Sequence, residues 1–223
     1  LGTVMRERSQ ELERLYAEHA KEVTKLTWLL GVTRGEVEDV TQEVWLAAHR
    51  TLAKRYNPNR RAWLFTITHG AVKTWRRTRK RRPEWSNDPD DGAEMVDVRT
   101  PETELDVQRR AQAARAFLQK AIPDDARRDA LVLHEGCGMT VKDVAEATGV
   151  SVVTAAWRLR MARRDLERAK ARMSAEEREK LRTLVVPFAS VDEILDALRT
   201  PADSLVSDEE VARGWDRLSS RIA

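Results

Sequence analysis

Hydrophobic residues recur at steps of three and four positions through the N-terminal third of the chain. This spacing places them on one face of a helix and predicts helices over residues 6–30, 33–52 and 60–81. The apolar stripe of the first helix contains Leu12, Leu15, Tyr16, His19, Val23, Leu26 and Leu30. The stripe of the second contains Val37, Val40, Val44, Trp45, Ala48 and Leu52. Each of these helices therefore has one apolar face.

Turn and capping residues separate the three predicted helices. Gly31 ends the first, and Thr33 begins the second with Glu36 three positions on, which is the spacing of a capping box. Asn57-Pro58-Asn59 predicts a turn before the third helix. Pro83 ends that helix, because the residue before a proline is disfavoured in helical conformation.

The helical spacing returns in the second half of the chain. The predicted helices cover 104–121, 124–134, 140–148 and 151–173. Glu135-Gly136-Cys137-Gly138-Met139 is predicted as a loop, and Thr140 with Asp143 as the cap of the helix after it. The short helix, the turn at Gly149 and the long helix form a helix-turn-helix arrangement. In that motif the second helix enters the DNA major groove. The alternative is an ordinary helical hairpin with solvated arginines.

The last fifty residues carry three further capping-box patterns. They are Ser174 with Glu177, Ser190 with Glu193, and Ser207 with Glu210. Three short helices are therefore predicted in this segment. The last of them has an apolar stripe that needs a partner surface, formed by Val211, Trp215, Leu218 and Ile222.

Charge is segregated along the chain, although the net charge is only +3. Residues 54–82 hold eleven Lys or Arg and no acid, whereas residues 84–106 hold nine acids and one Arg. Together with few Gly and Pro, the pattern predicts an all-α protein. Two basic helical domains would be joined by an acidic linker over residues 83–103, with a small helical C-terminal extension.

Aromatic residues interleave with the basic residues of the third predicted helix. Such a surface can stack unpaired bases and follow a nucleic-acid backbone. Trp63 and Trp75 are equally consistent with core packing, in which case the arginines are a solvated face. The dense run 76–82 favours a phosphate partner, because like charges at this density repel one another.

Other classes of protein find little support in the composition. A single cysteine, Cys137, excludes an internal disulfide and fits a reducing compartment. No apolar run is long enough to cross a bilayer and the first residues do not form a signal peptide, so we expect a soluble cytoplasmic protein. The sequence has no phosphate-binding loop and no metal-ligand spacing, and its four histidines are scattered. We therefore expect no catalytic activity, no metal and no cofactor.

Three motifs, taken in order, resemble bacterial sigma factors of the extracytoplasmic-function class. The run 37–45, VEDVTQEVW, looks like their acid-acid-x-x-Gln-Glu-x-aromatic signature. The run 61–67, RAWLFTI, is similar to the Trp-Leu-aromatic-x-Ile motif that follows it, and 150–163 resembles their recognition helix. The resemblance implies a region 2-like domain over 6–82, the acidic linker, a region 4-like domain over 104–173 and an extension over 174–223.

The resemblance also implies partners and site residues. A sigma factor binds the β′ clamp and β flap of core RNA polymerase, and here the clamp contacts would be Glu38, Asp39, Gln42, Glu43 and Trp45. The −10 promoter element would be contacted by Tyr56, Asn57, Arg60, Arg61, Trp63, His69, Lys73, Arg76 and Arg77. The −35 element would be contacted by Ser151, Val152, Thr154, Ala155, Arg158, Arg160 and Arg163. The free protein would be a monomer, with an anti-sigma factor as a further partner.

Two questions stay open at this stage. A stand-alone helix-turn-helix regulator that binds duplex operators is the alternative function, although it would need neither the acidic helix nor the aromatic and basic one. The extension 174–223 lies outside the resemblance. It would either regulate the protein in cis by packing on one of the two domains or simply enlarge the core.

Overall fold

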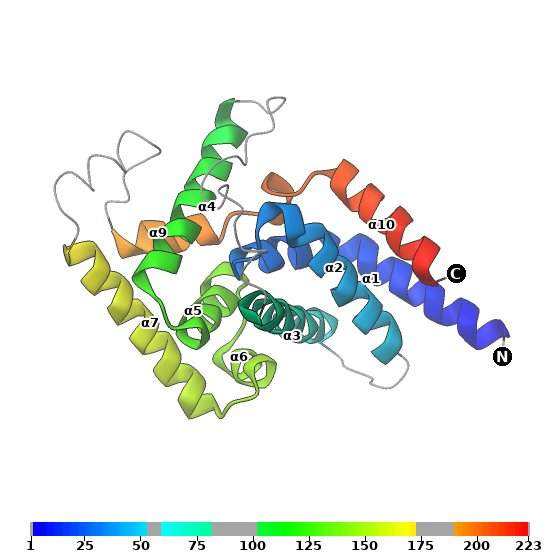
Figure 1. The fold of residues 1–223 in the computed structure, drawn as a ribbon, viewed down its shortest axis with the longest axis horizontal. Coiled ribbons are helices and arrows are strands. Elements are labelled where there is room, and N and C mark those ends of the chain that lie inside the picture. Colours follow the sequence, from blue (N-terminus) through cyan, green and yellow to red (C-terminus); the bar gives the residue numbers. More distant parts are fainter. Residues whose placement is uncertain (1, 53–58, 82–101, 173–189, 223) are drawn as a thin grey trace. The chain divides into compact units, whose positions relative to one another are not determined.

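The computed structural model describes residues 2–52, 59–81, 102–172 and 190–222, and every regular element in them is helical (Figure 1). The elements are α1 Gly2–Leu29, α2 Arg34–Thr51, α3 Arg60–Arg81, α4 Glu102–Ala121, α5 Asp125–Leu131, the π-helix η2 Val132–Gly136, α6 Val141–Thr148, α7 Val152–Arg172, α9 Val191–Leu198, the 3₁₀-helix η3 Ala202–Ser204 and α10 Asp208–Ile222. The prediction of an all-α protein is confirmed. The predicted acidic linker and the predicted helix start at Ser174 lie outside the described residues, except that the last two residues of the linker, Glu102 and Thr103, belong to α4.

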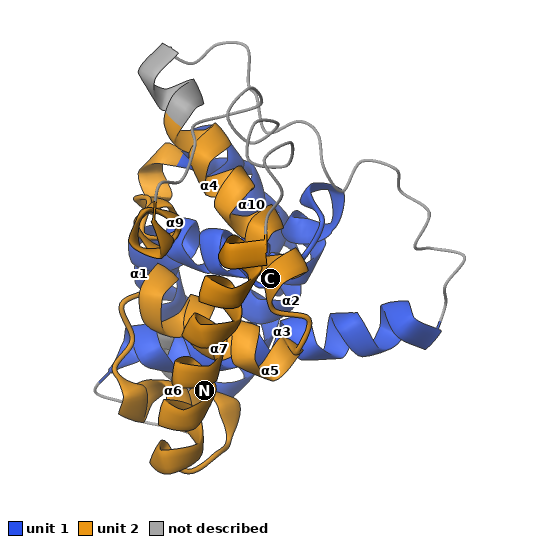
Figure 2. Cartoon of the chain, turned by 90° about the vertical axis from the view of Figure 1, so that its left-hand side faces the viewer, with its two compact units in different colours: residues 1–87, 205–223 blue, residues 88–204 orange. Residues whose placement is uncertain are grey.

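The chain divides into two compact units (Figure 2). Unit 1 comprises residues 1–87 and 205–223, and unit 2 comprises residues 88–204. Helices α1, α2, α3 and α10 belong to unit 1, and the other elements belong to unit 2. The C-terminal extension therefore does not form a unit of its own. It contributes α9 to one unit and α10 to the other.

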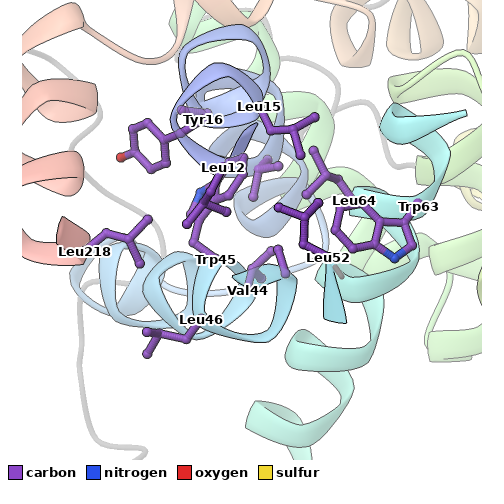
Figure 3. Close-up of a cluster of buried hydrophobic side chains, with 13 residues drawn as sticks. Leu12, Leu15, Tyr16, Val44, Trp45, Leu46, Leu52, Trp63, Leu64 and Leu218 are labelled. Carbon is purple, nitrogen blue, oxygen red and sulfur yellow. The ribbon is translucent and has the colours of Figure 1, made fainter. Parts of the chain in front are cut away.

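The core of unit 1 is an apolar cluster drawn from all four of its helices (Figure 3). Leu12 of α1, Trp45 of α2, Leu64 of α3 and Leu218 of α10 are fully buried in it. Burying one such side chain contributes about 1.5–3 kcal/mol. These residues are the apolar stripes of the sequence pattern, so helical periodicity alone locates this core.

Glu36 joins the start of α2 to α3. Its carboxylate accepts hydrogen bonds from the Thr33 hydroxyl at 2.5 Å, the Trp75 indole N–H at 3.0 Å and the Arg79 guanidinium at 2.6 Å. The predicted capping box at Thr33 is wrong, because its hydroxyl donates to this carboxylate and makes no cap hydrogen bond to the backbone. Glu36 therefore bonds to side chains of α3, which lie far from it in the sequence, in addition to the Thr33 hydroxyl.

Unit 2 contains the predicted helix-turn-helix. Thr140 and Asp143 form a capping box at the start of α6, as predicted. Gly149 ends α6 with φ of 68°, a left-handed conformation that glycine adopts without strain. Val144 and Ala145 of α6 are buried, as is Leu159 of α7. The two helices therefore pack through the small and branched residues that the sequence placed there.

The helix before this motif is longer than predicted. The π-helix η2 continues α5 through Gly136, so the predicted loop 135–139 is wrong at its first two positions. Glu135 is buried in this turn, and its two carboxylate oxygens accept from Arg163 and Arg199. These partners lie on α7 and just after α9, too far along the chain for a local pattern to reveal.

The two described helices of the extension begin as predicted. The Ser190 side chain accepts the Glu193 backbone N–H at 3.2 Å at the start of α9. Ser207 and Glu210 bond reciprocally at the start of α10. In α9 four apolar side chains are buried, Ile194, Leu195, Ala197 and Leu198. They pack α9 against α4, η2 and α7.

Candidate polymerase and nucleic-acid interfaces

The five residues predicted to bind polymerase divide into exposed acids and buried residues. The side chains of Glu38, Asp39 and Glu43 are 47%, 80% and 56% exposed. Gln42 is 2% exposed and Trp45 is fully buried. Trp45 packs against Tyr16, with ring centroids 4.8 Å apart, so its assignment as a polymerase contact is corrected to a core residue. We call the surface formed by Glu38, Asp39, Gln42 and Glu43 the acidic side of α2.

Helix α10 contacts every residue of the acidic side. Arg217 pairs with Glu38 at 3.3 Å and with Asp39 at 3.2 Å. Arg221 pairs with Glu43 at 3.4 Å. The Gln42 amide donates to the Gly214 carbonyl oxygen at 2.7 Å. The acidic side is thus occupied by a helix of the same chain.

Tyr16 of α1 makes a further attachment for α10. Its hydroxyl donates to the Val211 carbonyl oxygen at 3.0 Å, and its ring lies 5.0 Å from that of Trp215. Burial, together with the nearby carboxylates of Glu38 and Asp216, raises the pKa of Tyr16 to about 12. At neutral pH the hydroxyl is therefore protonated and able to donate this bond.

Two of the arginines predicted to contact the −10 element, Arg60 and Arg61, have structural partners in unit 1. Arg60 pairs with Glu11 at 3.1 Å. Arg61 donates to Glu22 at 2.8 Å and lies over the Phe65 ring at 4.7 Å. Burial alone would raise the pKa of Glu22, but hydrogen bonds from His19 and Arg61 outweigh it and lower that pKa. Intramolecular ion pairs and stacking engage both side chains in this structure, and their contact with the −10 element stays a prediction.

The other predicted −10 residues differ in exposure. Arg76 donates to the Leu30 carbonyl oxygen, and its contact with DNA stays a prediction. Trp63 is 6% exposed in the core cluster, so the core interpretation holds and its assignment as a base contact is corrected. His69 is half-buried, whereas Lys73 and Arg77 are exposed. Tyr56 and Asn57 lie outside the described residues.

Several predicted −35 residues serve the fold of α7. Ser151 accepts the Thr154 backbone N–H at 3.1 Å, and their hydroxyls lie 2.9 Å apart, which caps the helix. Ala155 is fully buried, which corrects its assignment as a base contact. Val152 is 50% exposed and Arg160 is exposed, and Arg158 is half-buried. The start of α7 therefore offers fewer polar groups to DNA than its sequence suggests.

Two exposed apolar side chains at the start of α7 were not among the residues predicted to contact DNA. Val153 is 79% exposed and Trp157, one turn later, is 45% exposed. The Arg127 guanidinium lies 5.8 Å from the Trp157 ring centroid. Apolar side chains in a major groove can contact thymine methyl groups. Their exposure could have been predicted from the sequence, because both residues fall outside the apolar stripe of α7.

Arg163 is held within unit 2. It shares the carboxylate of Glu135 with Arg199, and the Arg199 bond is 2.5 Å long. Burial alone would raise the pKa of Glu135, but hydrogen bonds from the two guanidinium groups outweigh it and lower that pKa. Glu135 is consequently ionised at neutral pH. The Arg163 side chain is 51% exposed beside this ion pair, and its contact with DNA stays a prediction.

The described residues contain neither a metal-binding cluster nor a membrane-spanning helix. No group of three or more His, Cys, Asp or Glu side chains in these ranges could hold a metal ion. None of the described helices is both long and apolar enough to span a membrane.

Comparison with known proteins identifies the family. Residues 15–82 match the model of Sigma-70 region 2, and residues 124–166 match that of Sigma-70, region 4. The fold is similar to that of the sigma factor RpoE from Bartonella quintana, in its co-crystal structure with the anti-sigma factor NepR. The identity is 20% and the TM-score 0.50, over 74% of this chain and 98% of that one. The two matches place the chain in the Sigma-70 class of sigma factors.

Membership of this class establishes the general activity of the chain. As a sigma factor, it binds core RNA polymerase, recognises promoter DNA and directs the initiation of transcription. The two matched regions fall one in each compact unit. The curated proteins searched include no match to this chain.

Proposed function

We propose that the two units of this sigma factor divide polymerase binding and promoter recognition between them. The acidic side of α2 binds core RNA polymerase, and the exposed basic residues of α3 contact the −10 element. The observation that carries the proposal is the array of Glu38, Asp39 and Glu43 on one helix, exposed and within the region 2 match. Like charges on one helix repel each other, so the array favours a cationic partner surface.

The DNA contacts follow from exposure and charge. Lys73 and Arg77 are the exposed predicted cations of α3, and cations of this kind neutralise phosphates. In unit 2 the start of α7 presents Val152, Val153 and Trp157 toward solvent, with Arg160 exposed one turn later. This arrangement supports groove contacts by short and apolar side chains and phosphate contacts by arginine.

The proposal extends to regulation and location. RpoE is bound to an anti-sigma factor in its co-crystal structure. We extend a partner of that kind to this chain, together with action in the cytoplasm, where core polymerase is found. The chain has no catalytic role of its own in this proposal.

Run-off transcription with saturating core polymerase tests the proposal. The full chain should direct initiation from its promoter. The variant Glu38→Lys/Asp39→Lys/Glu43→Lys should lose at least tenfold of this activity, because it reverses the charge of the proposed docking surface. Glu13→Lys, an exposed acid on α1, is the matched control and should retain activity. If the wild-type chain directs no initiation but binds duplex operators, the stand-alone helix-turn-helix regulator is the better description.

A further inference from the structure

Helix α10 lies on the surface to which we assign polymerase binding. We infer that α10 is an internal competitor of core RNA polymerase for the acidic side of α2, so that the chain restrains its own assembly into holoenzyme. The inference rests on the proposed function, because it takes the acidic side to be the polymerase-docking surface.

The contacts of α10 match the acidic side position by position. Gly214, Arg217 and Arg221 are three and four residues apart, which places them on one face of α10. That face meets the Gln42 amide through a carbonyl oxygen and the three acids through two guanidinium groups. A cationic helix face thus pairs with the array that favours a cationic partner, although the acids remain partly exposed.

Gly214 allows this close approach. It is buried, and a Cβ atom at this position would lie 2.3 Å from the Tyr16 hydroxyl oxygen. Tyr16 is itself 5% exposed and is bonded to Val211, so it has little room to yield. Any side chain at position 214 therefore works against the docked position of α10.

The packing of α10 is suited to release as well as to docking. Of its fifteen residues, Gly214 and Leu218 are buried, while Val211, Trp215 and Ile222 are only partly buried against the core of unit 1. Beneath it, the Gln42 side-chain oxygen and the Trp45 indole nitrogen are buried without hydrogen-bond partners in the described structure. Buried polar atoms of this kind oppose the docked state. The ion pairs of Arg217 and Arg221 are half-exposed and contribute little each.

The covalent link makes such weak docking effective. Residues 199–207 connect α9 in unit 2 to α10 in unit 1. A tethered segment meets its site at an effective concentration on the order of millimolar. If α10 is docked in about 99% of molecules, the apparent affinity for core polymerase falls about 100-fold.

The test compares core-polymerase affinity between full-length variants, by fluorescence anisotropy of labelled sigma factor titrated with core enzyme. Arg217→Glu/Arg221→Glu opposes the acids of α2, and Gly214→Ala removes the space for Tyr16. Both should bind core at least tenfold more tightly than wild type. Arg213→Glu is the matched control, because Arg213 is exposed on the same helix and pairs only weakly with Glu209 at 3.9 Å. Its affinity should be unchanged.

A peptide in trans provides an independent measurement. A synthetic peptide of residues 205–223, in excess, should weaken core binding by the Arg217→Glu/Arg221→Glu variant. The same peptide carrying the two Glu substitutions should not. Hydrogen exchange over residues 208–222 in the free variants reports directly whether α10 has left α2.

The outcomes separate the inference from the proposed function. If both α10 variants release α10 but bind core no more tightly than wild type, while Glu38→Lys/Asp39→Lys/Glu43→Lys loses core binding, the self-competition is overturned and the docking surface stands. If that acidic-side variant binds core as wild type does, the proposed docking surface itself is wrong.

Discussion

Helices α9 and α10 begin with the same local pattern but pack differently. Each starts at a serine with a glutamate three positions on, and each presents an apolar stripe. Four of the eight residues of α9 are buried, against two of the fifteen of α10. Helix α9 packs on core elements of unit 2, whereas α10 packs one side of its apolar stripe on the core of unit 1 and pairs with exposed acids of α2.

The difference shows how one segment of fifty residues can have two roles. The free energy that holds a surface helix against its domain increases with the apolar area that the helix buries. Helix α9 is therefore an integral part of its unit, which is the core-enlarging alternative raised by the sequence. The shallow packing of α10 suits the regulatory alternative, so the two hypotheses apply to different halves of the extension.

The largest expected effect on stability comes from truncating a buried side chain of α9. Ile194→Ala should lower the free energy of unfolding by about 2–5 kcal/mol, because Ile194 is 2% exposed and its removal leaves a cavity. Urea denaturation followed by circular dichroism measures this loss. Asp192→Ala, exposed on the same helix, should change it by no more than about 0.5 kcal/mol. A similarly small loss for Ile194→Ala would remove the distinction between the two helices.

Truncating a buried side chain of α10 should have a smaller effect on stability, confined to that helix. Leu218→Ala removes the one fully buried apolar side chain of α10, and it should cost about 1–3 kcal/mol, because the helix can detach instead of unfolding the unit. Hydrogen exchange should accelerate in residues 208–222 and stay slow in α1 and α2. Arg213→Ala should leave exchange as in wild type. Equal acceleration throughout unit 1 would mean that α10 is integral to its core, like α9.

The ion pairs of Glu135 should make the attachment of α9 dependent on pH. The pKa of Glu135 is lowered below its ordinary value of 4.5 in the folded chain, so its contribution is present above pH 4.5 and is lost as pH falls through the folded value. Glu135→Gln should cost about 1–2 kcal/mol at pH 7. The gap between wild type and variant in urea midpoints should close as pH falls below 4.5 and through the lowered pKa of Glu135 in the folded chain. A gap that stays constant with pH would contradict this role for the carboxylate.

The smallest effect concerns the salt dependence of −35 binding. Arg160→Ala should reduce the slope of log K against log salt by about 0.9, because one phosphate contact is lost. Arg163→Ala should leave the slope unchanged, since its guanidinium is paired with the Glu135 carboxylate that Arg199 also binds. DNA-binding titrations with holoenzyme at several salt concentrations measure both slopes. Equal slopes for the two variants would show that Glu135 does not hold Arg163 away from DNA.

Local sequence patterns predicted much of this molecule correctly. Thr140 with Asp143 and Ser207 with Glu210 lie within one turn of each other, so their bonding needs nothing from the rest of the chain. Helical periodicity likewise predicted that Leu12, Trp45 and Leu218 lie on the buried face of their helices, because positions on one face of a helix repeat every three or four residues. The all-α class and the order of the helices follow from the same short-range rules.

Tertiary packing decided which of the charged and aromatic residues are available. Glu36 bonds to Trp75 and Arg79, and Arg163 bonds to Glu135, across separations that no local pattern encodes. The pairing of Arg217 with Glu38 and Asp39 spans most of the chain. The sequence shows that the acidic and basic groups exist, but only the packed structure brings α10 onto α2, because long-range ion pairs depend on where the apolar stripes place each helix.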